Sequence, residues 1–320
     1  MTHNQMDDMI NAIVERVAME LSKGASAPEE KKEGASTFDI NKVEKKDLSS
    51  GSSVQSAGSS PADGTDDGEL IDITSPEVKA IPTLKHCEDP EGLERMMRST
   101  PARIGVGNCG ARLRTQTMLT LRADHAAARD AVFRDVDQSV LDRLGLFTIE
   151  TKCSDKTQFL TRPDLGRQFD DAVISELKSK CVMNPDVQIY ASDGLSSTAI
   201  TANLENILPV IIDGLKAKGL KVGTPFFVKN GRVAAMDQIS EALGATVTCA
   251  LIGERPGLAT AESMSAYIAY KATVGMPEAR RTVVSNIHSK GIPAVEAGAY
   301  IVDVIEMMLE AKASGVDLKK

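Results

Sequence analysis

The sequence has no tryptophan, and aromatic residues make up only 3% of its 320 residues. Proteins that bind single-stranded nucleic acid stack the bases on aromatic side chains, so this scarcity argues against such a role. Basic residues are not in excess either, because 37 lysines and arginines stand against 45 acidic residues, for a net charge of −8. An acidic chain has no general attraction to phosphate backbones or anionic lipid. We therefore expect neither nucleic acid nor a membrane as a partner.

Patterns typical of disulfides and metal sites are also missing. Five cysteines and four histidines lie far apart, and no CxxC pair occurs. An odd number of widely spaced cysteines is typical of reduced thiols in a cytoplasmic protein, and no zinc set is visible. No apolar run reaches the roughly 20 residues that a membrane span needs, and no secretory signal is visible at the N-terminus. We expect a cytoplasmic protein without a structural metal.

The first 70 residues divide into two segments of different composition. Apolar residues from Met6 to Leu21 recur at spacings of three and four, which predicts an amphipathic helix over residues 1–22. Residues 23–69 contain too few large apolar side chains to form a core, so we expect a disordered linker. A short helix on a long tether favours a docking role; the alternative is a terminal helix that packs on the body of the protein.

The remaining chain changes its pattern near residue 183. Residues 70–182 are predicted to be mainly helical, with a helix that begins at Asp89-Pro90 and others at 115–134 and 167–181. From 183 to 320, apolar runs alternate with helical stretches, which predicts an α/β fold: a Rossmann-like, mostly parallel sheet domain preceded by a helical region and a disordered N-terminal extension. The expected strands are 187–191, 222–228, 246–253 and 282–287, and the expected helices are 197–218, 234–243, 260–270 and 293–313.

Polar loops that contain glycine follow all four expected strands, at residues 192–197, 229–233, 253–258 and 285–291. The carboxyl ends of parallel strands share one edge of a sheet, where ligands bind, and glycine allows close backbone approach. Any one such loop is an ordinary turn, but four at one edge favour a binding crevice. Asp193 and Glu254 would form a carboxylate pair if their loops converge.

Three signals point weakly to other chemistry. Gly105–Gly110 matches GxGxxG, but it follows a predicted helix instead of a strand, so an anchoring or interface loop fits it better. Asn286 and His288 resemble the DxHxxG motif in which a histidine ligates cobalt, with Asn in place of Asp; a loop histidine bonded to nearby backbone is favoured. His125 is expected to be packed or on the surface. We therefore predict no catalytic residue in this chain.

Six motifs, taken together, are far more specific. They are Arg98–Gly107, Leu160–Arg167, Ser192–Ser196, Gly223–Val228, Gly253–Leu258 and Ser285–His288. In this order they resemble the small (light) subunit of adenosylcobalamin-dependent ethanolamine ammonia-lyase, over about residues 90–320. The resemblance implies a subunit that covers part of base-on adenosylcobalamin, while a large subunit converts ethanolamine to acetaldehyde and ammonia by a radical route.

The resemblance also implies which residues contact the cofactor. They are Val233, Glu254 and Val283, and relatives can have Cys at the position of Val283. A backbone contact there would survive the change, whereas a thiol contact would be lost. The resemblance further implies a bacterial microcompartment, with residues 1–22 as an encapsulation peptide that binds shell proteins. Two alternatives stay open: a scaffold subunit that tethers its partner without contacting the cofactor, and a nicotinamide oxidoreductase, for which the first loop of the α/β domain lacks GxGxxG.

Overall fold

A computed structural model describes residues 72–318 apart from 74, 85 and 101. Every described residue belongs to one compact unit of the chain. The predicted helix 1–22 and the predicted linker 23–69 lie outside the described residues. No helix in the described part is both long enough and apolar enough to cross a membrane.

The first part of the described chain is built from helices and one small hairpin. Helix α3 begins where the sequence predicts, because the Asp89 side chain accepts a hydrogen bond from the Gly92 amide and Pro90 stands at the first helical position. Helix α4 covers almost the whole of the predicted stretch 115–134. The elements are α2 (Pro76–Lys79), α3 (Pro90–Ser99), β1 (Asn108–Cys109), β2 (Arg112–Leu113), α4 (Thr115–Phe133) and α5 (Gln138–Arg143).

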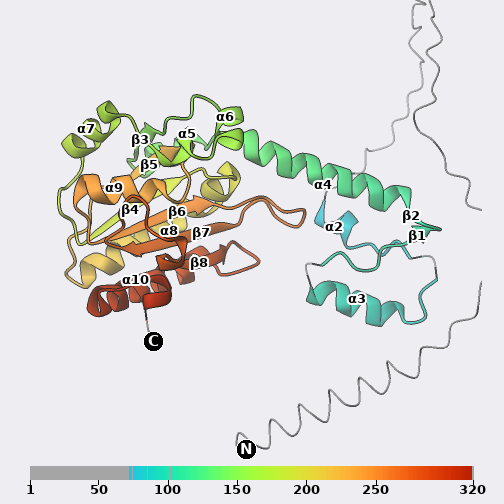
Figure 1. Ribbon diagram of the computed structural model, residues 1–320. Coiled ribbons are helices and arrows are strands. Elements are labelled where there is room, and N and C mark those ends of the chain that lie inside the picture. Colours follow the sequence, from blue (N-terminus) through green and yellow to red (C-terminus); the bar gives the residue numbers. More distant parts are fainter. Residues whose placement is uncertain (1–71, 74, 85, 101, 319–320) are drawn as a thin grey trace, which may run out of the picture. The chain divides into compact units, whose positions relative to one another are not determined.

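One six-stranded sheet forms the centre of the remaining chain (Figure 1). Its strands are β3 (Phe147–Glu150), β4 (Val187–Ser192), β5 (Phe226–Lys229), β6 (Val247–Gly253), β7 (Met264–Tyr270) and β8 (Thr282–Ile287). They lie in the order β3-β5-β4-β6-β7-β8, and every pair is parallel except the two that involve β7. The prediction of a mixed α/β fold with a mostly parallel sheet is confirmed.

Helices cover both faces of this sheet. Side chains of α5, α8 and α10 pack with one face, and those of α7 and α9 pack with the other. Every residue of β4 and β6 is buried, as expected for strands that are covered on both faces, and both strands are mostly apolar. The helices are α6 (Lys156–Thr161), α7 (Asp171–Lys180), α8 (Ser197–Ala217), α9 (Ala235–Leu243) and α10 (Ala294–Ala311), with short 3-10 turns η1 (Leu165–Arg167), η2 (Glu278–Arg280) and η3 (Gly315–Asp317).

The structure corrects three expectations. The predicted helix 260–270 is wrong, because Met264–Tyr270 is strand β7, antiparallel to β6. Both of its faces are largely buried, so the run shows no alternation that separates a strand from a helix. Strand β5 begins at Phe226 instead of residue 222, since Pro225 has no amide hydrogen to donate to a ladder. Strand β3 lies within the stretch predicted to be mainly helical.

Candidate functional site

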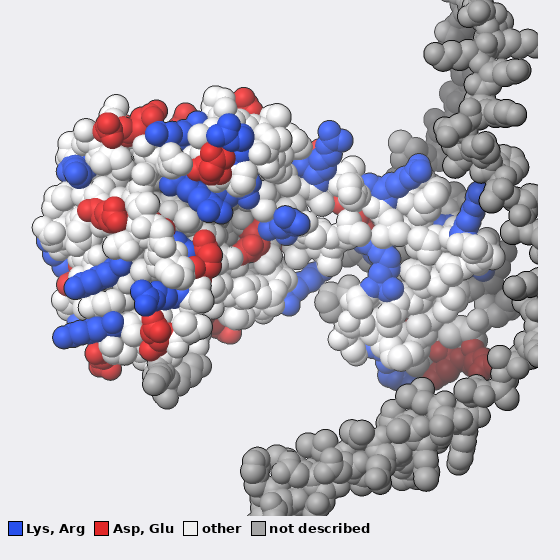
Figure 2. Space-filling view, in the orientation of Figure 1, with Lys and Arg blue, Asp and Glu red and all other residues white. Residues whose placement is uncertain are grey.

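The four polar loops do lie at one edge of the sheet. Strands β4, β5 and β6 are parallel, and β8 points the same way because it is antiparallel to β7, which is antiparallel to β6. Residues after the carboxyl ends of these four strands therefore share the edge at which α/β proteins bind ligands. We call this the carboxyl edge. Figure 2 shows that basic and acidic side chains are interspersed on the visible face of the part that contains the sheet.

Glycines bring three of these strand ends into close backbone contact. Gly194 has a φ of 53°, and the next amide, that of Leu195, donates to the Gly253 carbonyl at 3.0 Å. A Cβ at Gly253 would come within 2.5 Å of the Asp193 carbonyl oxygen and closer still to that of Ser196. A Cβ at Gly231 would meet the Ser192 hydroxyl at 2.5 Å. Larger residues at these glycines would force the ends of β4, β5 and β6 apart.

Asp193 holds the same strand ends together electrostatically. Its side chain is 2% exposed and forms an ion pair with Lys156, at the start of α6. Burial raises the pKa of Asp193, while the Lys156 ammonium and the backbone amides of Asn230 and Gly231 stabilise its carboxylate. A carboxylate with this many partners is fixed in place. Asp193 therefore orders the edge and is not free to act as a base or to pair with Glu254.

Glu254 and Val283 lie on the face of the sheet that carries α9. The Glu254 carboxylate accepts a hydrogen bond from the Tyr267 hydroxyl at 2.8 Å. Burial and this bond raise the pKa of Tyr267, so the phenol stays protonated and donates. Tyr267 is in register with Val283, and paired residues present their side chains on the same face. Val283 is 45% exposed, so no helix of the described chain covers this position.

Val233 is half-buried in the loop that leads into α9. Its side chain packs against the core on the α9 side, which Tyr267 also contacts. Its amide donates to no acceptor within the described chain and so stays available. The structure thus places all three predicted residues along the carboxyl edge or the adjoining face. Tyr267 escaped the sequence analysis because its segment was predicted to be a helix.

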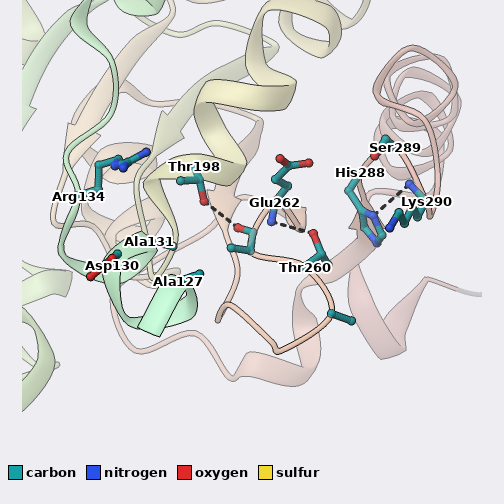
Figure 3. Close-up of a pocket in the computed structure, with 12 residues that line it drawn as sticks. Ala127, Asp130, Ala131, Arg134, Thr198, Thr260, Glu262, His288, Ser289 and Lys290 are labelled. Carbon is teal, nitrogen blue, oxygen red and sulfur yellow. Dashed lines mark hydrogen bonds between the residues drawn. The ribbon is translucent and has the colours of Figure 1, made fainter. Parts of the chain in front are cut away.

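A hollow of about 430 Å³ also opens at the carboxyl edge (Figure 3). The loop after β6, the loop after β8 and the first turn of α8 meet the end of α4 there. The Thr198 hydroxyl donates to the Ala261 carbonyl at 2.9 Å and ties two of these elements together. Val233, Glu254 and Val283 do not line this hollow. Its lining is Ala127, Asp130, Ala131, Arg134, Thr198, Ala259, Thr260, Ala261, Glu262, His288, Ser289 and Lys290.

The ring of His288 is held within its own loop. Its Nδ1 accepts from the Lys290 amide at 3.2 Å, and its Nε2 lies 2.8 Å from the Asn286 side-chain oxygen. An accepting Nδ1 places the ring proton on Nε2, which donates to Asn286. Both nitrogens are therefore occupied, and neither is presented to a metal. Among the described residues, no group of three or more His, Cys, Asp and Glu side chains could hold a metal ion.

The other sequence signals lie in the first part of the described chain. The segment Gly105–Gly110 runs into hairpin β1–β2, and the Gly107 amide donates to the Thr83 hydroxyl at 2.9 Å. It therefore does not join a strand to a helix as a nucleotide-binding turn does. His125 is exposed on α4. Its neighbour Asp124 is buried and pairs with Lys79 and Arg103, so that α2 and the segment just before Gly105 are both held to α4.

The fold and the arrangement of the polar loops define the general class to which this protein belongs. It is a mixed α/β protein whose polar loops gather at the carboxyl ends of a mostly parallel sheet. Residues 90–319 match the family described as ethanolamine ammonia-lyase light chain, and the chain belongs to that family. The resemblance carried by the six motifs is confirmed.

Curated relatives carry the corresponding name. The chain is similar to the ethanolamine ammonia-lyase small subunit of Clostridium tetani, with 61% identity over 254 residues, 79% of this chain and 86% of the relative. The small subunits of Fusobacterium nucleatum and Listeria innocua are 57% identical over 254 residues and 53% identical over 253, again covering 79% of this chain and 86% of the relative. The chain is thus a subunit of a lyase complex, and a small subunit implies a large one.

Proposed function

We propose that this chain helps to hold adenosylcobalamin, in its base-on form, at the interface with the large subunit of ethanolamine ammonia-lyase. The observation that carries the proposal is the grouping of Glu254, Tyr267 and Val283 on one partly uncovered face beside the carboxyl edge. The large subunit would convert ethanolamine to acetaldehyde and ammonia, and catalytic residues are expected there.

The residues present fit a corrinoid. Adenosylcobalamin is a broad macrocycle with amide side chains at its rim, so it needs hydrogen-bond acceptors, donors and apolar contact. Glu254 uses one carboxylate oxygen for Tyr267 and keeps the other for an amide of the rim. The Val233 amide is free to donate, and the exposed Val283 side chain offers apolar contact.

Val283 can also contact the cofactor through its backbone. It lies on β8, which is the last strand in the order of the sheet. At every second residue, an edge strand presents amide and carbonyl groups that no neighbouring strand uses. Replacement of the relatives' cysteine by valine would leave such a contact intact.

The part that this chain plays is binding and orientation. When bound, adenosylcobalamin supplies the radical chemistry. The Lys156–Asp193 ion pair and the close glycines keep the carboxyl edge rigid, so that Val233 and Glu254 are held in place before the cofactor arrives. The covering subunit also excludes water from the reaction.

A test of the contact compares two carboxylates of the connection between β6 and β7. Glu254→Ala in the full complex should weaken adenosylcobalamin binding by about 10-fold or more, because it removes a hydrogen bond that involves a charged group. Glu262→Ala, which removes an exposed carboxylate from the same connection, is the matched control and should bind normally. Cobalamin absorbance during titration reports the affinity. Equal affinity for the Glu254 variant and the parent would contradict the assigned contact.

The scaffold alternative makes a different prediction. If the chain only tethers its partner, the large subunit alone should bind adenosylcobalamin as tightly as the complex does. Co-expression with a candidate large subunit, with each subunit omitted in turn, should show cobalamin-dependent acetaldehyde formation only when both are present. Full activity without this chain would favour the scaffold.

We also propose that residues 1–22 direct the complex into a bacterial microcompartment by contacting shell proteins, so that the protein works in the cytoplasm inside that compartment. The amphipathic pattern and the tether of residues 23–69 support this role. Deletion of residues 1–22 should leave activity intact and abolish packaging. A truncated chain that still enters compartments would contradict the idea. The division into a helical region, 70–182, and a Rossmann-like domain, 183–320, likewise remains our proposal.

A further inference from the structure

Three arginines from three different loops stand at the carboxyl edge without an acidic partner. Arg167 ends the turn η1, Arg232 lies in the loop after β5, and Arg255 lies in the loop after β6. None of them forms an ion pair with any described residue. The nearby Asp193 is already paired with Lys156. Burial lowers the pKa of Arg232, and repulsion from Arg167 and Arg255 lowers it further.

The guanidinium of Arg232 is held in a fixed position. Its Nη2 donates to the Phe159 carbonyl at 2.7 Å, and its Cζ lies 4.0 Å from the centre of the Phe159 ring. The Arg232 amide donates to the Gly166 carbonyl at 2.7 Å, which brings the neighbouring Arg167 to the same place. The Arg232 Nε is buried and has no hydrogen-bond partner. A half-buried cation that is fixed but not neutralised destabilises the free protein, and an anion would relieve that cost.

We propose that Arg167, Arg232 and Arg255 form an anion site that takes the phosphodiester of the cobalamin nucleotide tail. This inference rests on the proposed function. The peripheral groups of the corrin ring are neutral amides, so the phosphodiester is the one anionic group that the cofactor presents. Arginine suits a phosphate because its planar guanidinium donates two parallel hydrogen bonds. Arg232 and Arg255 directly adjoin Val233 and Glu254 in the chain, so the anion site and the proposed corrin contacts are neighbours.

The test compares adenosylcobalamin with adenosylcobinamide, which lacks the phosphodiester and the nucleotide. The double variant Arg167→Gln/Arg255→Gln alters two exposed side chains without partners, so the fold should be unaffected. In the full complex it should bind adenosylcobalamin about 10- to 100-fold more weakly than the parent and adenosylcobinamide equally well. Arg280→Gln is the matched control: an exposed arginine before β8, at the opposite edge, paired with Asp317. It should bind both compounds normally.

The salt dependence of binding gives a second readout. The dissociation constant of the parent for adenosylcobalamin should rise with KCl, and this dependence should be weaker in the double variant.

Unchanged affinity of the double variant for adenosylcobalamin, an equal loss of affinity for both compounds, or an unchanged salt dependence would each overturn the anion site. So would weaker association of the subunits without cofactor, because the arginines would then bind a carboxylate of the partner. If the parent complex binds no adenosylcobalamin, the proposed function itself fails; normal binding by parent and variant removes only the anion site.

Discussion

Gly253 offers the sharpest test of the close packing at the carboxyl edge. It ends β6, and a methyl group there would come within 2.5 Å of the Asp193 carbonyl oxygen and closer still to that of Ser196. Its φ is not in the left-handed region, so Gly253→Ala introduces a steric clash without backbone strain. Both opposing atoms belong to the backbone and cannot rotate away. The ends of β4 and β6 must therefore separate.

The expected loss is at the upper end of the range for overpacking, about 3 kcal/mol of the free energy of unfolding. For a protein of this size, 1 kcal/mol corresponds to roughly 2–4 °C, so the apparent Tm of the complex should fall by about 6–12 °C. Gly257→Ala is the matched control in the same loop, since the nearest atom to its Cβ would be the Thr260 carbonyl oxygen at 3.8 Å. It should be neutral or up to about 1 kcal/mol more stable, because alanine restricts the unfolded chain.

Differential scanning fluorimetry of the parent and the two variants, side by side, measures the differences in apparent Tm. Gly253→Ala should also weaken cofactor binding if the strand ends position Val233 and Glu254 as proposed. A Gly253 variant that melts within about 1 °C of the Gly257 variant would refute the reasoning, because 1 °C corresponds to well under 1 kcal/mol. It would mean that these backbones are not in contact.

Three further predictions concern buried groups. Burial raises the pKa of Asp124, but hydrogen bonds from Lys79 and Arg103 outweigh burial and hold this pKa below its usual value. The stability that Asp124 contributes is therefore complete above roughly pH 4 and is lost as the pH falls through the folded value. The protection factors of the α2 amides, which correct for the pH dependence of intrinsic exchange, should be lower at pH 3 than at neutral pH, and unchanged protection factors would contradict this. Asp237→Ala leaves the buried Arg281, 1% exposed, with the exposed Glu278 as its one acidic partner among the described residues. The free energy of unfolding, measured in urea, should fall by about 3 kcal/mol. A decrease below about 1 kcal/mol would count against the buried pair. Burial raises the pKa of Cys181 to about 11 and that of Cys249 to about 12, while Cys109 is exposed. Iodoacetamide at pH 8 should therefore label Cys109 first. Equal labelling of all three cysteines would be inconsistent with the burial of Cys181 and Cys249.

Much of the fold could be predicted from local pattern. Strands β4, β6 and β8 and helices α4, α8, α9 and α10 begin and end within about two residues of the expected bounds. The strands β4 and β6 are mostly apolar, and helix α3 begins at the predicted cap Asp89-Pro90. The family was also readable, because six motifs in a fixed order are specific even when each one is an ordinary turn. Val233, Glu254 and Val283 came from that resemblance, and their proposed contacts await the tests above.

Other features depend on which segments pair across the sheet, and local pattern does not report pairing. Residues 264–270 are apolar enough for either a helix or a strand, and they are a strand because β6 and β8 offer ladders on both sides. That pairing alone sets Tyr267 beside Glu254 and Val283. The convergence of Arg167, Arg232 and Arg255 likewise joins loops up to 88 residues apart in the chain. The spacing of apolar residues along the sequence determined which residues are buried. Which polar groups meet was decided by contacts between distant segments, because those contacts depend on the complete packing of the sheet.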